Sequence, residues 1–445
     1  MRRIIDRRDF IGITAAAGVS LATSKVIATQ ANTSEDDELN IAVIGAGIQG
    51  ETLMTTCLKM GKHAGVRFKA VCDIWEELTL KRVLGVLRRF GHEARGYVDY
   101  RQMLQEEKDL DAVIIATPDF CHAEQTVACL NTGLNVYCET PMSNTVDSAR
   151  EMVEAAGQTG KLLQIGHQRR SDPRYIHCRD KLLFMSRLLG RITAVNAQWN
   201  QPARSDRGWS KRRQMDPATL AEYGYSSMHE FKNWMWYKAL GAGPVVNFGV
   251  HQIDVINWFL GTKPKSVTAR GGNYYYEVKT HEWDDVVMAI FDYETQEGPV
   301  SAYYQMITTN GYGGHFEAFM GDQGTLEMSQ SARGNSVYRD PDTPDWDKWV
   351  RLGFLHRPGM KEQKEDASVL EVAETKPPVK YGIPVVLRDP YYSPHLQNFF
   401  DAVRGKAKLN YPAETAYAAT ITALKMREAV VAGRTLAFEP KEFNI

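Results

Sequence analysis

The sequence predicts an α/β protein of two domains: an N-terminal doubly wound Rossmann domain and a C-terminal α+β domain with a largely antiparallel, open-faced sheet. Three observations predict this fold. A short apolar run is followed at once by a glycine-rich turn (residues 40–50). Strand-like and helix-like segments then alternate up to residue 166, and later strand-like segments follow one another without crossover helices. Alternation of strands and helices is typical of a parallel sheet, and its loss is typical of an antiparallel one.

The glycine-rich turn predicts a dinucleotide site. An apolar strand, Asn40–Ile44, leads into Gly-x-Gly-x-x-Gly, and a helix-compatible stretch follows. The first glycine permits the tight turn, the second lets backbone N–H groups approach a pyrophosphate, and the third allows close packing of helix on strand. The predicted contacts in the turn are Gly45, Gly47, Ile48, Gln49 and Gly50.

A second strand, Phe68–Cys72, ends in Asp73, 23 residues after the last glycine of the turn. An acid at this distance accepts hydrogen bonds from the ribose 2′-hydroxyl and repels a 2′-phosphate. Ile74 follows, where NADP enzymes often carry a basic residue. NAD is therefore expected as the cofactor in preference to NADP.

The α/β alternation continues through strands at 111–116, 135–138 and 162–165 and helices at 122–132 and 145–159, so the Rossmann domain is predicted over residues 39–166. Ligands of such sheets bind at the carboxyl ends of the strands. The important loops are therefore Thr117-Pro118-Asp119, Glu139-Thr140-Pro141 and residues 166–170.

The second domain is predicted over residues 167–445. It has strand-like segments at 191–200, 265–276, 285–293 and 299–308, a polar, Trp-rich stretch at 203–238 and a Pro- and charge-rich surface excursion at 335–380. Helices are expected at 395–404 and 412–432.

The first 31 residues are predicted to be an export signal, with a basic head, a weakly apolar middle and small residues before an acidic stretch. Arg7-Arg8-Asp9-Phe10-Ile11 resembles a twin-arginine core. Five basic and two acidic residues give this segment a net charge of +3. Since the whole chain has a net charge of −1, the remainder carries −4. We therefore expect a periplasmic or otherwise exported protein. No later segment is apolar enough to span a membrane, and the near-neutral charge gives no reason to expect a nucleic acid partner.

The loops and later segments together resemble the glucose–fructose oxidoreductase/inositol dehydrogenase (Gfo/Idh/MocA) family across essentially the whole chain after the signal. The markers are the glycine turn, Ala116-Thr117-Pro118 with His122, Cys138-Glu139-Thr140-Pro141, Gly166-His167-Gln168, Asn247-Phe248-Gly249-Val250-His251 and Gly321-Asp322-Gln323-Gly324-Thr325-Leu326. The resemblance implies NAD(P)-linked redox chemistry on sugars, cyclitols or related polyols, often in a homo-oligomer built through the open sheet.

Two departures from the family pattern concern the catalytic positions. The family usually has Glu-Lys-Pro where this chain has Glu139-Thr140-Pro141, and threonine cannot be a cation. The family also tends to place Asp four residues before the catalytic His, whereas here Asn247 precedes His251, and Asn does not exchange protons at ordinary pH. The resemblance thus implies catalytic positions at Thr140, Asn247 and His251, of which only His251 is unchanged.

His251 is the first candidate for the base that accepts a hydroxyl proton, because the pKa of histidine suits this task near neutrality. His167, Tyr223 and Tyr237 are lesser candidates. The alternative is a structural His251 that helps to start a helix over Gln252–Leu260.

The strand-end loops supply further candidates. The expected cofactor contacts are Thr117, Pro118, His122, Glu139, Thr140 and Gln168, and the expected substrate contacts are His167, Arg169, Arg170, Asn247 and His251. Arg169 and Arg170 could equally be solvated, and Trp199, Trp209, Trp234 and Trp236 could stack on a sugar or pack in the core. No metal is expected, since acids and histidines nowhere have a convincing ligand spacing.

Three functions remain open. The first is an NAD(P)-dependent oxidoreductase that acts on a secondary hydroxyl of a sugar, glycoside or cyclitol and holds its cofactor tightly, because free NAD is scarce outside the cytoplasm. The second is a redox-assisted glycosidase, known in exported family branches that lack the lysine, in which transient oxidation, elimination and water addition give hydrolysis. The third is a non-catalytic NAD- or sugar-binding protein.

Overall fold

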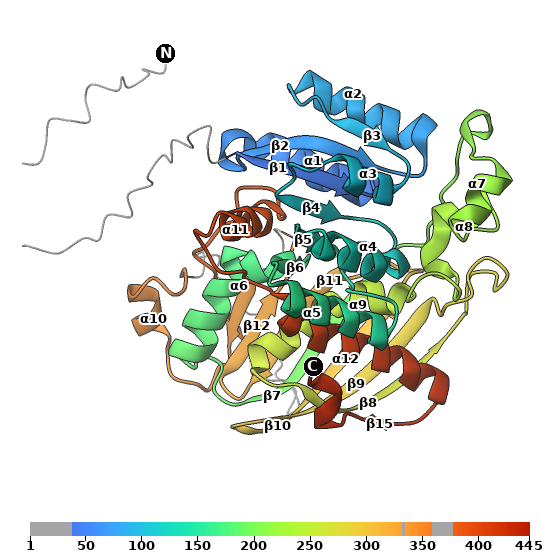
Figure 1. Ribbon diagram of the computed structural model, residues 1–445. Coiled ribbons are helices and arrows are strands. Elements are labelled where there is room, and N and C mark those ends of the chain that lie inside the picture. The colour runs from blue at the N-terminus through green and yellow to red at the C-terminus, as the bar shows by residue number, and fades with distance from the viewer. Residues whose placement is uncertain (1–37, 332–333, 358–376) are drawn as a thin grey trace, which may run out of the picture.

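The computed structural model describes residues 38–331, 334–357 and 377–445, which form two β-sheets surrounded by helices (Figure 1). The predicted signal at residues 1–31 lies outside the described residues. Among the described helices, none combines the length and apolar character needed to cross a bilayer.

The first sheet has six parallel strands in the order β3-β2-β1-β4-β5-β6. These are β1 (Leu39–Ile44), β2 (Val66–Cys72), β3 (Arg95–Tyr97), β4 (Ala112–Ile115), β5 (Asn135–Cys138) and β6 (Leu163–Ile165), with helices α1 (Ile48–Met60), α2 (Lys81–Arg89), α3 (Tyr100–Glu106), α4 (Asp119–Asn131) and α5 (Val146–Thr159). The predicted Rossmann arrangement is confirmed. The sequence interpretation missed β3, α2 and α3, because two of the three residues of β3 are exposed and give no apolar pattern.

The second sheet has nine strands in the order β14-β13-β12-β11-β7-β10-β9-β8-β15, antiparallel except for the β7–β10 pair. They are β7 (Ile192–Asn200), β8 (Pro264–Gly272), β9 (Val286–Thr295), β10 (Gly298–Ile307), β11 (His315–Gly321), β12 (Gly324–Met328), β13 (Ser336–Arg339), β14 (Val379–Gly382) and β15 (Leu436–Ala437). The expectation of a surface excursion over 335–380 is wrong at both ends, since β13 and β14 extend the sheet.

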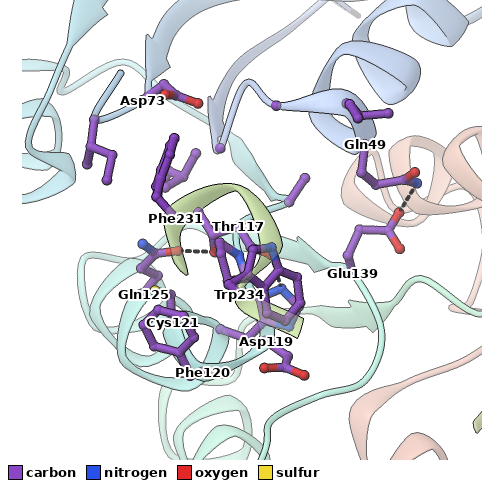
Figure 2. Close-up of a pocket in the computed structure, with 18 of the residues that line it drawn as sticks. Gln49, Asp73, Thr117, Asp119, Phe120, Cys121, Gln125, Glu139, Phe231 and Trp234 are labelled. Atoms are coloured by element: carbon purple, nitrogen blue, oxygen red, sulfur yellow. Dashed lines mark hydrogen bonds between the residues drawn. The ribbon is translucent and has the colours of Figure 1, made fainter. Parts of the chain in front are cut away.

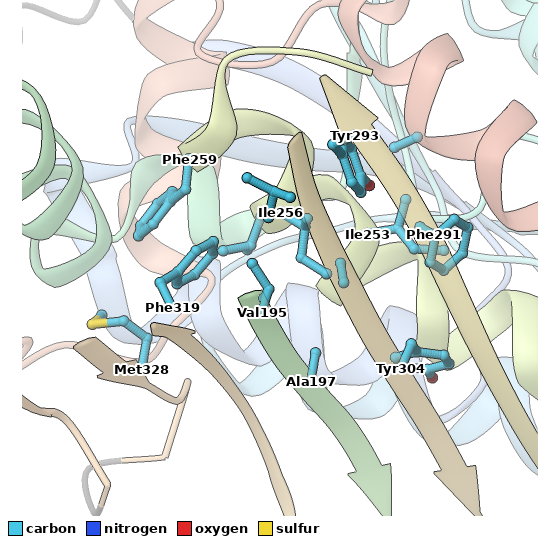
Figure 3. Packing of buried hydrophobic residues seen from close by; sticks show 14 of the residues in the cluster. Val195, Ala197, Ile253, Ile256, Phe259, Phe291, Tyr293, Tyr304, Phe319 and Met328 are labelled. Atoms are coloured by element: carbon cyan, nitrogen blue, oxygen red, sulfur yellow. The ribbon is translucent and has the colours of Figure 1, made fainter. Parts of the chain in front are cut away.

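One face of this sheet is covered and the other is open. Ile253 and Ile256 of α9 (Pro244–Leu260) pack on Val195 of β7 and Phe291 of β9 in a continuous core (Figure 3). Buried and exposed residues alternate along β9, which is the pattern of a strand with one buried face.

Helix α9 begins eight residues before the predicted Gln252. Gly243, at the N-cap of α9, has a φ of +92°, a left-handed conformation that separates the helix from the preceding segment. Pro244 occupies the first turn, where no helical hydrogen bond needs its missing N–H. The earlier start corrects the interpretation of His251 as a helix-starting residue. Asn247 and His251 are instead four residues apart within one helix and share a face.

The two C-terminal helices bind the two sheets together. Leu396, Phe399 and Phe400 of α11 (Ser393–Val403) complete the apolar cluster of the first sheet, which includes Ile41 of β1. Helix α12 (Ala413–Ala432) lies between α5 and α9, and its residues enter the cores of both sheets. Residues 393–432 were predicted to belong to the second domain, but they also form part of the core of the first domain.

The Trp-rich stretch forms a separate cap (residues 203–238) that stands beside the first domain (Figure 1). It carries the short helices α7 (Pro217–Glu222) and α8 (Met228–Asn233). Its own apolar cluster includes Trp75, which follows β2 of the first domain, and Phe120 of α4 packs against it. The cap is therefore attached to the strand ends of the Rossmann sheet.

Candidate functional site

A cleft of about 690 Å³ lies at the carboxyl ends of β1, β2, β4 and β5, between the first domain, the cap and α9 (Figure 2). Its volume falls in the range of small-molecule sites. Predicted residues that line it are Gly45, Gly47, Ile48, Gln49, Asp73, Thr117, Pro118, His122, Glu139, Thr140, Gln168, Asn247 and His251. Gly50 does not line it, and its role is one of packing.

The glycine turn fits a dinucleotide pyrophosphate. Gly45 has a φ of +89°, and a Cβ on Gly50 would lie 1.9 Å from the carbonyl oxygen of Gly45, so both glycines are required by the turn itself. A Cβ on Gly47 would meet nothing within 4 Å. Gly47 caps α1, whose first N–H groups face the cleft end of the helix, where an anion is favoured.

Asp73 lines the cleft just after β2, where the sequence predicts the ribose contact. Its carboxylate accepts hydrogen bonds from the backbone N–H of Ala46 and of Trp75, both at 2.8 Å. Burial raises the pKa of Asp73 to about 6, although these two hydrogen bonds lower it. Each carboxylate oxygen can accept a second hydrogen bond, so the side chain can still receive ribose hydroxyls.

Gln49 and Glu139 lie away from Asp73, on the other side of the cleft (Figure 2). The Gln49 amide donates to Glu139 at 3.0 Å, and the Thr140 N–H lies 3.4 Å from the other carboxylate oxygen. Burial raises the pKa of Glu139 to about 7. This pair ties α1 to the loop after β5, at the end of the cleft where a nicotinamide ring would lie.

His122 lines the cleft through a fixed ring. Its two ring nitrogens lie 2.8 Å from the carbonyl oxygens of Thr117 and Pro141, so it joins the loops after β4 and β5. The Thr117 hydroxyl donates to Gln125 at 2.6 Å. His122 therefore supports the cofactor loops, and the peptide bond between Thr140 and Pro141 within them is cis.

Thr140, Asn247 and His251 converge on the cleft from the two domains. The Asn247 amide donates to the buried Asp119 at 2.9 Å, which joins the start of α9 to the start of α4. The His251 ring stacks on Trp199, and its Nδ1 is buried without a hydrogen-bond partner among the described residues. Burial holds the pKa of His251 well below its ordinary value, so the ring is neutral.

Contrary to the prediction, His167, Arg169 and Arg170 lie beneath the cleft. Arg169 is paired with the buried Glu317, and Arg170 with the buried Asp254. Each guanidinium group is paired with its acid rather than free to bind a substrate, because a buried charge requires a partner. His167 contacts two residues that line the cleft, Thr140 through a 3.0 Å hydrogen bond and His251 through ring centroids 5.5 Å apart.

The two tyrosine candidates for the base differ in position, since Tyr223 lines the cleft and Tyr237 does not. The Tyr223 hydroxyl donates to the Val98 carbonyl, and the Tyr237 hydroxyl is bonded to His229 outside the cleft. Of the candidate tryptophans, Trp199 and Trp234 line the cleft, and Trp209 and Trp236 do not. The sequence interpretation did not name Trp75, Arg207, Phe231 and Lys232, which line the cleft, or Asp254, which pairs with Arg170. Asp119 was placed in an important loop but was given no role.

Two family models match the chain. Residues 39–167 match the oxidoreductase family with an NAD-binding Rossmann fold, and residues 181–327 match the GFO/IDH/MocA C-terminal domain. The chain belongs to the Gfo/Idh/MocA oxidoreductase family. The expected enzyme class and the NAD-binding nature of the first domain are thereby confirmed.

Known Gfo/Idh/MocA proteins resemble this chain at low identity. An inositol 2-dehydrogenase from Rubrobacter xylanophilus is 26% identical over 304 residues, which cover 66% of this chain and 72% of that protein. Other inositol 2-dehydrogenases match over 38–56% of their own length.

Solved structures share the fold. The WlbA dehydrogenase from Bordetella pertussis, in complex with NADH and UDP-GlcNAcA, has a TM-score of 0.65 at 15% identity and covers 90% of this chain and 98% of that one. A levoglucosan dehydrogenase in complex with NADH has a TM-score of 0.64 at 18% identity, with 90% and 99% covered.

Proposed function

We propose that this family member oxidises a secondary hydroxyl of a sugar or glycoside with an NAD that stays bound between turnovers. The observation that supports it is the convergence of Thr140, Asn247 and His251 on the end of the cleft next to Glu139. The acid at Asp73 favours NAD over NADP. Relatives named for inositol and levoglucosan support a polyhydroxylated ring as the substrate class.

Each part of the chain has a distinct role in this reaction. The glycine turn and Asp73 hold the dinucleotide. Trp199, whose ring stacks on Phe248, His251 and His315, forms part of the cleft wall next to the substrate. Bound NAD supplies the acceptor for the hydride that leaves the hydroxyl-bearing carbon. His251 and Asn247 hydrogen-bond substrate hydroxyls and thereby set which carbon faces the acceptor.

Retention of the cofactor is supported by the cap. Phe231 and Lys232 of α8 line the same cleft as Asp73, and Phe231 packs edge-on against Trp75 with ring centroids 5.6 Å apart. A nucleotide bound in the cleft would lie against the cap, so we expect these contacts to slow its release. Such retention suits export by the twin-arginine route, which we propose from residues 1–31, because that route carries folded proteins.

The proposal predicts that purified protein contains NAD. Denaturation should release about one NAD per chain, and incubation with mono- and disaccharides should yield a ketone product. Asp73→Ala should lower nucleotide retention roughly ten- to 100-fold, since a hydrogen bond to a charged group contributes about 1.5–3 kcal/mol. Released NAD should be quantified by chromatography. Wild-type-like retention in Asp73→Ala would contradict the ribose assignment, and the absence of sugar turnover would contradict the oxidation.

Redox-assisted hydrolysis of a glycoside is the second candidate. The absence of the family lysine at Thr140 favours it, together with a cofactor that is enclosed by the cap. The same assay separates the two functions. Ketosugar without cleavage supports net oxidation, whereas glycoside cleavage with no net change in the NAD redox state supports hydrolysis.

A homo-oligomer through the open face of the nine-stranded sheet is also part of the proposal. Met288 and Ile290 of β9 are 43% and 48% exposed on this face. An apolar patch on a flat sheet is suited to a second copy of the same surface.

A further inference from the structure

Thr140 stands where the family has its lysine, and its hydroxyl connects the cleft to a buried histidine. Thr140 lines the cleft, and its Oγ1 lies 3.0 Å from Nε2 of His167. The His167 side chain is 1% exposed. A hydroxyl can donate one hydrogen bond and accept others, so it can pass a proton between a substrate and a base behind it.

Behind His167 lies a carboxylate that is held in place. Nδ1 of His167 lies 3.5 Å from Oδ2 of Asp254 and makes no hydrogen bond among the described residues, so the two groups can form an ion pair once the ring is protonated. Arg170 donates two hydrogen bonds to Asp254, at 2.9 and 2.6 Å, and the Tyr411 hydroxyl donates another. Burial would raise the pKa of Asp254, but Arg170 and His167 hold it below its ordinary value, so the carboxylate is ionised.

The carboxylate determines which nitrogen of His167 carries the proton. An anion near Nδ1 favours hydrogen on that nitrogen, which leaves a lone pair on Nε2. Nε2 then accepts the hydrogen of the Thr140 hydroxyl. Thr140 in turn presents its oxygen lone pairs to the cleft.

We propose that Thr140, His167 and Asp254 form a proton relay that replaces the missing lysine. This inference rests on the proposed oxidation. As the hydroxyl-bearing carbon loses its hydride to NAD, the hydroxyl proton moves to Thr140 Oγ1 and the Thr140 proton moves to His167 Nε2. The C–O bond becomes a carbonyl, the threonine is regenerated, and the imidazolium faces Asp254. Thr140 is the catalytic residue, and Asp254 is a positioning residue.

The surroundings of the two histidines favour His167 over His251 as the proton acceptor. The charged and titratable groups around His167 are Asp254, Arg169, Arg170, His251, His395 and Tyr411. Burial lowers the pKa of His167 to about 4, while Asp254 opposes this shift. Around His251, by contrast, Arg169, His167 and His315 all lower the pKa further. Only a proton on His167 is compensated by an acid.

Kinetics of matched variants test the relay. Thr140→Val keeps the shape and removes the hydroxyl, and it should lower kcat about 100-fold or more with little change in KM. Thr140→Ser should restore most of the lost kcat. His167→Gln should lose a similar amount, and the Thr140→Val/His167→Gln double variant should lose no more than either single variant, because the residues act as one unit. Losses that multiply, or a kcat for Thr140→Val within threefold of wild type, would overturn the relay.

A readout independent of turnover comes from ¹⁵N-histidine NMR of the NAD-loaded protein. The relay requires hydrogen on Nδ1 of His167, and Thr140→Val should shift the Nε2 resonance through loss of its hydrogen bond. Hydrogen on Nε2 in the wild type would overturn the relay even if every sugar is inert, which separates its failure from failure of the proposed oxidation. Thermal unfolding and bound NAD, measured on each variant, identify any loss of kcat caused by misfolding.

Discussion

Gly47 and Gly50 are three positions apart in one turn and are required for different reasons. A side chain on Gly50 would collide with the Gly45 carbonyl oxygen, whereas the space beside Gly47 is open. The first glycine of this pair is therefore kept for the ligand and the second for the fold. The sequence motif predicts the same division, with Gly47 next to the pyrophosphate and Gly50 in the packing of helix on strand.

A matched pair of substitutions distinguishes these two roles. Gly50→Ala should destabilise the protein by roughly 1–3 kcal/mol because the turn must shift to admit the methyl group, and its thermal midpoint should fall. Gly47→Ala should leave the midpoint of the nucleotide-free protein unchanged and weaken NAD binding. Calorimetry and nucleotide titration measure the two effects. Equal loss of stability in both variants would contradict the assignment.

Residues outside the motifs show why the site could be predicted only in part. The glycine turn and Asp73 were found because one βαβ unit brings them together within a short stretch of chain. His167 and Asp254 are 87 positions apart, and their proximity depends on how α9, which packs on the second sheet, lies against the loop after β6. Arg170 was assigned to the substrate because nothing in the sequence revealed that its acid, Asp254, lay beside it.

At the scale of elements, α9 is longer than the predicted Gln252–Leu260 and includes Gly249. In the folded chain a Cβ there would lie 2.9 Å from Met426 and 3.2 Å from Tyr304, so this glycine lets α9 pack closely against α12 and the sheet. Tertiary packing thus outweighs the low helix propensity of glycine. The longer helix is what brings Asn247 and His251 to the cleft.

The cap makes a prediction at this same scale. Phe231→Ala removes the edge-on contact with Trp75 and should speed NAD release about two- to tenfold, since an aromatic pair contributes about 0.5–1.5 kcal/mol. Release can be followed by nucleotide exchange under dialysis. Tyr312→Ala, at a side chain that is 86% exposed outside the cap, is the matched control. Identical release rates in the two variants would show that the cap does not retain the cofactor.

At the scale of the whole molecule, the open sheet face predicts the assembly state. Ile290 lies opposite Tyr303 on one neighbouring strand and Thr268 on the other, so a charge at this position sits in the middle of the face. Ile290→Lys should convert the oligomer to monomers, as measured by light scattering. Val431→Lys, at an exposed position of α12, should leave the mass unchanged. A wild-type protein that is already monomeric would contradict the proposal.

The position of α11 has a consequence for biosynthesis. Phe399 and Phe400 fill the core of the first sheet, and Tyr392, just before this helix, lines the cleft. The ribosome therefore finishes the strands of the first domain long before the residues that complete their packing emerge. The cleft is therefore complete only once α11 has been made, and we expect stable nucleotide binding only after that point.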